Sequence, residues 1–190
     1  MAMLALVGLT AFLIGHAFQA QMPEFAEDLG DADGGHGYTA LQMAQAAGAL
    51  AGGLALEAGG LLRPGVSAAI LFATLFAVTV AGFAAAPSVE VAVALLFLAG
   101  LFRLAFSTMA QTIVQLDAPT RIRGRALGLF SMAQMGLQVG SGLTVGVLGA
   151  VIGVHWSLGL SALTLAAATL ILLAFVRHNA VGSARREARR

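Results

Sequence analysis

The chain has 190 residues, of which 59% are apolar and only 10% are charged, and its mean hydropathy is +0.90. Soluble domains carry about 25% charged residues, so this composition excludes a water-soluble globular fold. The formal net charge of +1 says little, because acidic and basic residues are segregated along the chain. The sequence contains no cysteine, which excludes disulfide bonds and thiolate chemistry.

Long apolar segments predict membrane-spanning helices. A hydrocarbon core about 30 Å thick needs roughly 20 helical residues to cross it. The uncharged run from Ala126 to Val176 is too long for one crossing and suits two. Applied to the whole chain, this arithmetic predicts six spans, at about residues 3–22, 38–56, 64–86, 90–115, 125–150 and 155–176. The predicted fold is an all-α membrane bundle over residues 1–176, followed by a basic tail at 177–190.

Prolines, glycines and charges mark the ends of these spans. Pro23 and Glu24 close the first span, and Pro64 suits the first turn of the third helix. The last two spans are separated near Gly153, beside the interfacial Trp156.

Arginine placement predicts the orientation of the bundle, because short cytoplasmic loops collect basic residues. One set of loops, with the tail, holds Arg63, Arg121, Arg123, Arg125, Arg177, Arg185, Arg186, Arg189 and Arg190. The alternate loops hold acidic residues, namely Glu24, Glu27, Asp28, Asp31, Asp33 and Glu90. Both termini are therefore expected on the cytoplasmic side of a plasma (inner) membrane.

Four of the six predicted helices carry polar residues at helical spacing. These are His16 and Gln19 in the first, Gln42 and Gln45 in the second, Arg103, Ser107, Gln111 and Gln115 in the fourth, and Ser131, Gln134, Gln138 and Ser141 in the fifth. Intramembrane polar residues usually face a bundle interior or a water-filled cavity. They can also simply join helices, at about 0.6 kcal/mol per bond. The third and sixth helices carry only Ser and Thr, so they are expected to face lipid.

Arg103 is the most informative single residue of the sequence. It is expected near the membrane midplane, about 20 Å along the helix from Glu90. An arginine there costs at least about 2.5–3.5 kcal/mol on insertion scales. No predicted span places a carboxylate at that depth, so water, carbonyl groups, another chain or an anionic ligand are the expected partners. A snorkelling or water-solvated structural arginine is the alternative.

The segment from Gln111 to Phe130 carries a family resemblance. Its Pro119-Thr-Arg-Ile-Arg-Gly-Arg-Ala-Leu-Gly128 resembles the P-x-x-x-R-G-R-x-x-G signature between the tenth and eleventh helices of major facilitator superfamily transporters. The chain resembles their C-terminal six-helix half, especially in the drug- and siderophore-exporter branch related to the enterobactin exporter. The resemblance implies that the four polar helices surround substrate and the other two lie outside.

The resemblance also implies a cytoplasmic gate, formed by Glu57, Arg63, Asp117, Arg121, Arg123, Gly124 and Arg125. The loop arginines can bond the last carbonyl groups of the preceding helix and reach Asp117 or Glu57. Alternatively, they serve only to set topology. The second gating motif of the family is degraded, because Ala58 and Leu62 stand where basic residues are expected.

The implied function is the C-terminal half of a secondary transporter, which exports a small amphipathic or anionic compound by alternating access. The expected substrate cavity is lined by His16, Gln19, Gln42, Gln45, Arg103, Ser107, Gln111, Gln134 and Gln138. If protons drive transport, the coupling residue is His16 or lies in the other half. We expect no enzymatic activity, cofactor, metal site or nucleic-acid partner.

The expected partners are membrane lipid, a small-molecule substrate and a second six-helix half, because the family places its substrate between two halves. That second half is either a missing N-terminal half or a second copy of this chain. The sequence is therefore a fragment, a truncated gene product or a half-transporter that pairs. A non-transporting six-helix membrane subunit is the rival interpretation.

Overall fold

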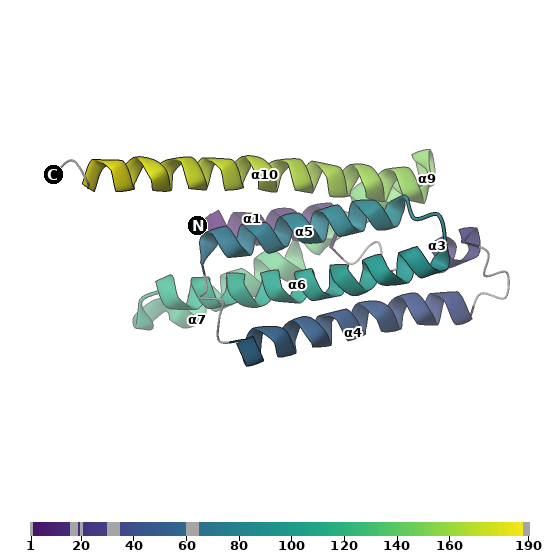
Figure 1. Ribbon diagram of the computed structural model, residues 1–190, viewed down its shortest axis with the longest axis horizontal. Coiled ribbons are helices and arrows are strands. Elements are labelled where there is room, and N and C mark those ends of the chain that lie inside the picture. The colour runs from purple at the N-terminus through teal and green to yellow at the C-terminus, as the bar shows by residue number, and fades with distance from the viewer. Residues whose placement is uncertain (1, 16–18, 20, 30–34, 60–64, 188–190) are drawn as a thin grey trace.

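The computed structural model describes residues 2–15, 19, 21–29, 35–59 and 65–187. The α-helices are α1 (Ala2–Leu13), α3 (Met22–Asp28), α4 (His36–Gly59), α5 (Val66–Ala84), α6 (Val89–Asp117), α7 (Arg123–Ser131), α8 (Gln138–Ser141), α9 (Leu148–Ile152) and α10 (Val154–Glu187). A 3-10 helix, η1 (Thr120–Ile122), precedes α7, and two π-helical segments, η2 (Met132–Gly136) and η3 (Gly142–Val147), interrupt the path from α7 to α9. The long helices run alongside one another (Figure 1).

Four helical segments of the described chain are long and apolar enough to cross a membrane. They are Val66–Ala84, Val89–Asp117, Thr120–Ile152 and Val154–Val176. The 24-residue α4 has sufficient length but is more polar, and the apolar part of α1 is shorter, at Met3–Leu13. The structure thus confirms an all-α protein with membrane-capable helices, whereas six crossings with cytoplasmic ends remain a prediction.

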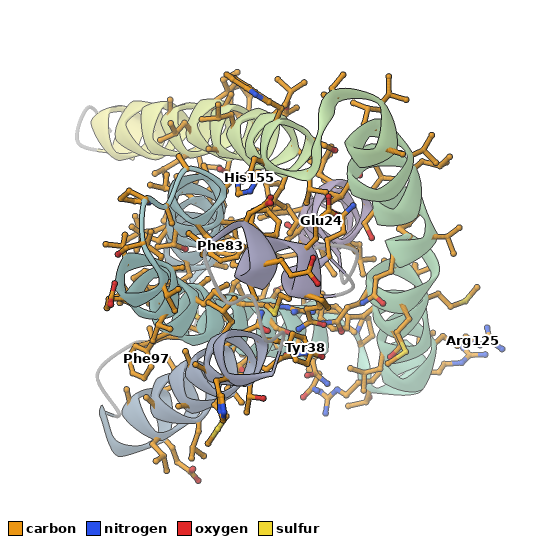
Figure 2. All side chains as sticks on the ribbon, turned by 90° about the vertical axis from the view of Figure 1, so that its right-hand side faces the viewer. Glu24, Tyr38, Phe83, Phe97, Arg125 and His155 are labelled. Carbon is orange, nitrogen blue, oxygen red and sulfur yellow. The ribbon has the colours of Figure 1, made fainter. Side chains whose placement is uncertain are left out.

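The first predicted span, 3–22, is not one continuous helix. α1 ends at Leu13, and Gly15 adopts a left-handed backbone conformation with φ of 46°. Glycine enters this region easily because it has no Cβ. The chain then forms the separate helix α3, which has Pro23 in its first turn. Figure 2 looks along the bundle from the end at which α3 lies, and α3 occupies the middle of that end.

α5 is more enclosed than its composition suggests. It packs against α6 on one side and α10 on the other, and half of its residues are buried within the bundle. Phe76 and Val80 are almost completely buried, whereas Leu71 and Val78 are exposed, so one face of this helix stays free for the predicted contact with lipid. α10 does expose a row of large apolar residues, which comprises Leu160, Leu163, Leu170, Ile171 and Phe175. Packing between two helices and contact with lipid both favour apolar side chains, so composition alone does not show how far a helix is enclosed.

Three glycines bring α4 and α6 into backbone contact. A Cβ at Gly48 would overlap the carbonyl group of Phe97, and one at Gly100 would overlap the carbonyl oxygen of Gln45. A Cβ at Gly52 would lie 2.7 Å from the carbonyl oxygen of Leu101. Small residues allow this approach in membranes, where van der Waals packing drives helix association. The crossing of α4 over α6 is therefore set by these glycines.

We predict that Gly48→Ala and Gly100→Ala each destabilise the bundle by about 1–3 kcal/mol, because the added methyl group meets backbone that cannot move aside. Thermal unfolding in detergent measures the effect. Gly128→Ala is the matched control, since no atom lies within 4 Å of its Cβ position. It should leave stability unchanged or raise it. Equal melting temperatures for Gly48→Ala and Gly128→Ala would contradict the close crossing.

Candidate functional site

A cavity of about 470 Å³ lies beside the crossing of α4 and α6. Its walls come from α4, α6, η2 and the start of α8, together with Gln19. The lining residues are Gln19, Gln42, Gln45, Ala46, Ala49, Gly100, Arg103, Leu104, Ser107, Gln134, Met135 and Gln138. Seven of the nine residues predicted from the sequence to share a cavity are therefore brought together here. The close crossing at Gly100 places the polar faces of both helices on one cavity.

Gln111 and His16 are the two remaining residues that were predicted to line the cavity. Gln111 lies one turn beyond Ser107 on α6, is exposed and does not line this cavity. Its position follows from the drift of a four-residue repeat on a helix with 3.6 residues per turn. His16 lies outside the described residues.

Hydrogen bonds tie the lining residues together across elements. The amide nitrogen Nε2 of Gln19 donates to Oε1 of Gln45 at 2.8 Å. The Nε2 of Gln134 donates to Oγ of Ser107 at 3.1 Å, which joins η2 to α6. Both bonds connect residues that are distant in sequence. The glutamines thus serve partly as interhelical connections, as the alternative interpretation holds, while they still line the cavity.

Gln45 retains an unused donor. Its side chain is only 7% exposed, and its Nε2 atom is buried without a hydrogen-bond partner. Its Oε1 already accepts the bond from Gln19. A buried donor without a partner costs about 1–3 kcal/mol.

Arg103 lies at the centre of the 29-residue α6. It lines the large cavity and also a smaller one of about 40 Å³, together with Ser107, Gln134 and Gln138. The smaller cavity extends towards α1, where Thr10 and Gly15 form part of its wall. The Arg103 side chain therefore lies between the large cavity and Gly15, just beyond the end of α1.

The predicted gate residues lie at the opposite end from α3. Asp117 and Arg125 line a third cavity, of about 560 Å³, between the end of α6 and the start of α7. Arg121, Arg123 and Glu57 are exposed. Within the described part of the chain, no ion pair joins Asp117 or Glu57 to the loop arginines. Gly124 has open space around its Cβ position, and Arg63 lies outside the described residues.

A sequence profile of the family described as "Transmembrane secretion effector" matches residues 2–188. This family is part of the major facilitator superfamily. The chain belongs to it. The match establishes a membrane transport protein with transmembrane helices, of a superfamily that is typically non-enzymatic. Neither a curated protein nor a solved structure matches the chain significantly.

A second polar cluster in this major facilitator chain was not predicted. The hydroxyl of Thr144, in η3, donates to the carbonyl oxygens of Phe12 at 3.2 Å and Leu13 at 3.1 Å. These carbonyl groups belong to the last turn of α1, which has no further helical turn to bond them. Thr144 therefore fastens the end of α1 to η3.

The carbonyl groups of η3 itself are also bonded by side chains. The hydroxyl of Ser157, on α10, donates to Thr144 at 2.7 Å and Val145 at 3.2 Å, and Gln21 Nε2 donates to Val145 at 3.0 Å. The wider turn of a π-helix leaves such groups without their usual α-helical partners. The sequence does not indicate that Ser157 bonds η3, because a serine in an apolar helix can equally bond its own helix.

We predict that Ser157→Ala destabilises the protein by about 1–3 kcal/mol, because buried carbonyl oxygens of η3 lose a donor. Denaturation of the purified protein in detergent measures the loss. Ser161→Ala is the matched control, since Ser161 is also buried on α10, one turn further along. Equal stability of the two variants would show that the bond from Ser157 contributes nothing.

Proposed function

We propose that this protein is a secondary transporter that exports a small amphipathic or anionic compound by alternating access. The observation that carries the proposal is the cavity beside the centre of α6, which is lined by Arg103 and by polar residues such as Gln45. Membership of the transmembrane secretion effector family supports an export direction.

The chemistry of the cavity wall supports an anionic or acceptor-rich substrate. Arg103 is the only charged residue among the described lining residues. Guanidinium groups bind carboxylate and phosphate groups through several donors at once. Ala46, Ala49 and Leu104 add apolar surface to the same wall, which suits the hydrophobic part of an amphipathic molecule.

The proposed arrangement in the membrane has six crossings, with both termini and the arginine-rich loop on the cytoplasmic side of the inner membrane. α1 and α4 supply the two crossings beyond the four apolar segments. Segregation of the arginines on one side supports this orientation. α3 and its acidic residues then face the opposite compartment.

The proposed partner is a second six-helix half, which is either a separate N-terminal half or a second copy. Large apolar residues are exposed on α4 and η2 beside the cavity, namely Met43, Leu50, Leu54, Met132 and Met135. Lipid or a facing bundle can cover them, but the polar cavity between them needs a second wall to exclude lipid. The loop arginines Arg121, Arg123 and Arg125 are proposed to pair with acidic groups only when the cytoplasmic ends close.

We predict that Arg103→Gln abolishes most specific export activity, because the cavity loses its positive charge. Export per molecule in the membrane is measured in a full-length context, with protein abundance determined separately. Arg103→Lys is the matched variant that retains charge, and it should keep part of the activity. Normal export by the Gln variant would refute a substrate-binding role. Loss of abundance at unchanged specific activity would assign Arg103 a structural role.

We also predict that the 190-residue chain alone, as a monomer, does not transport. Its cavity is open on one side, and exposure of Gln42, Gln134 and Gln138 to hydrocarbon is costly. Reconstitution in liposomes tests this through oligomeric state and uptake of lipophilic anions. A transporting dimer would identify a half-transporter. A transporting monomer would refute the two-wall proposal, and a stable monomer without transport, bound to another membrane protein, would favour the subunit interpretation.

A further inference from the structure

Both ring nitrogens of His155 face hydrogen-bond acceptors. His155 is in the first turn of α10, and its Nδ1 lies 2.9 Å from the carbonyl oxygen of Ala84, at the end of α5. Its Nε2 lies 3.1 Å from Oδ2 of Asp28, at the end of α3. The ring also meets the Phe25 ring edge-on, with centroids 4.4 Å apart. One imidazole thus joins three helices.

The two acceptors select one protonation state of the ring. Neutral imidazole has one N–H donor and one lone pair, whereas imidazolium has two donors. Either neutral tautomer keeps one of these bonds and turns its lone pair towards the other acceptor. Only the protonated ring donates to the Ala84 carbonyl and the Asp28 carboxylate together. The second bond is then also an ion pair, which strengthens it.

The joined helix α3 lies over the end of the bundle. Figure 2 shows α3 in the middle of this end, with His155 and Phe83 close to it. Its residues Phe25 and Ala26 are each only 1% exposed, and the Phe25 ring packs on that of Phe83 with centroids 4.7 Å apart. Gln21, which bonds to η3 near the break in α1, immediately precedes α3. Gln19, two residues before Gln21, lines the large cavity, so a movement of α3 also acts on the wall of that cavity.

We propose that His155 is a proton-binding site that fastens α3 to α5 and α10 and loosens it when the proton leaves. Imidazole changes its charge between about pH 5 and pH 8. The fastened state is therefore favoured below this range and weakened as pH rises through it. The further step, in which release of α3 alters access to the cavity, rests on the proposed function. The fastening of α3 by His155 does not rest on it.

Other titratable groups lie on the elements around His155. Among the described residues, Asp28 is the only acidic group within ion-pair distance of His155. α3 also carries Glu24 and Glu27, and Glu90 lies in the first turn of α6. α5 contributes the Ala84 carbonyl group, and α4 carries His36 in its first turn. Asp31 and Asp33 lie outside the described residues.

The absence of cysteine from the sequence allows a direct test. A single cysteine at Ala26, which is buried on α3, reports release of the helix, and one at the exposed Glu24 on the same helix is the control. The ratio of their maleimide labelling rates in proteoliposomes removes the pH dependence of the thiol reaction itself. We expect this ratio to rise about five- to tenfold from pH 5.5 to pH 8.5, the size that corresponds to the loss of one ordinary hydrogen bond.

Two variants test whether protonation of His155, rather than packing alone, holds α3 in place. In Asp28→Asn the amide can donate to a neutral ring or accept from a charged one, so the labelling ratio should become independent of pH. His155→Gln should also be independent of pH, because an amide does not titrate in this range. An unchanged ratio in the parent protein, or a pH dependence that survives both variants, would overturn the proposal.

Hydrogen exchange of the α3 amides in the unmodified protein gives a second measurement, in case the Ala26 cysteine disturbs packing. Faster exchange at pH 8.5, after correction for the intrinsic rate, supports the site, and equal protection at both pH values overturns it. Neither measurement uses transport. A pH-dependent α3 in a protein that does not transport would thus refute the proposed function alone.

Discussion

The hydrocarbon interior offers backbone groups no water to bond, so every departure from α-helical geometry in this bundle needs a partner from elsewhere in the protein. α1 ends inside its predicted span, and η3 widens the fifth predicted helix. The structure brings these two departures together, where Thr144 bonds the end of α1 and Ser157 bonds η3. The end of α1 is thus bonded by η3, and η3 in turn by α10 and Gln21.

The cavity follows from this arrangement and from the close crossing of α4 and α6. Gly100 allows α6 to touch the backbone of α4, and one turn later Arg103 lines the cavity between these helices and η2. A continuous first helix would run past Arg103, whereas the break at Gly15 places a glycine in the wall of the smaller cavity instead. Polar groups near the centre of the bundle are thus accommodated by backbone geometry as much as by side-chain pairing.

Composition and spacing predict those parts of the structure that depend on one helix at a time. The interval from Glu90 to Asp117 places Arg103 at the centre of its helix, and the structure has it there. The four-residue spacing of Arg103 and Ser107 likewise predicts that both line one cavity. Gln111 departs from this cavity because a helix turns slightly further than the spacing assumes.

Features that depend on contacts between helices escaped prediction. Gly15 resembles any glycine of a membrane span, yet it is left-handed and lies so close to Ser141 of α8 that no Cβ would fit. The π-helical segments leave no mark on hydropathy. α5 is apolar because helices cover both its sides, yet lipid contact would select the same residues. The contact of His155 with Asp28 joins positions 127 residues apart, which no local pattern reveals.

The two ends of the bundle carry different chemistry, and this difference bears on how such a protein can be regulated. Arginine stays charged at every physiological pH, so Arg121, Arg123 and Arg125 can set orientation and pair with acidic groups but cannot respond to protons. The end that carries α3 places a histidine against a carboxylate and a backbone carbonyl, an arrangement whose strength depends on one proton. A permanent charge suits a function that must hold under all conditions, and a titratable one suits a contact that must sometimes open. Among the described side chains, the histidine that lies between two acceptors is therefore at the end that carries α3, whichever compound the cavity binds.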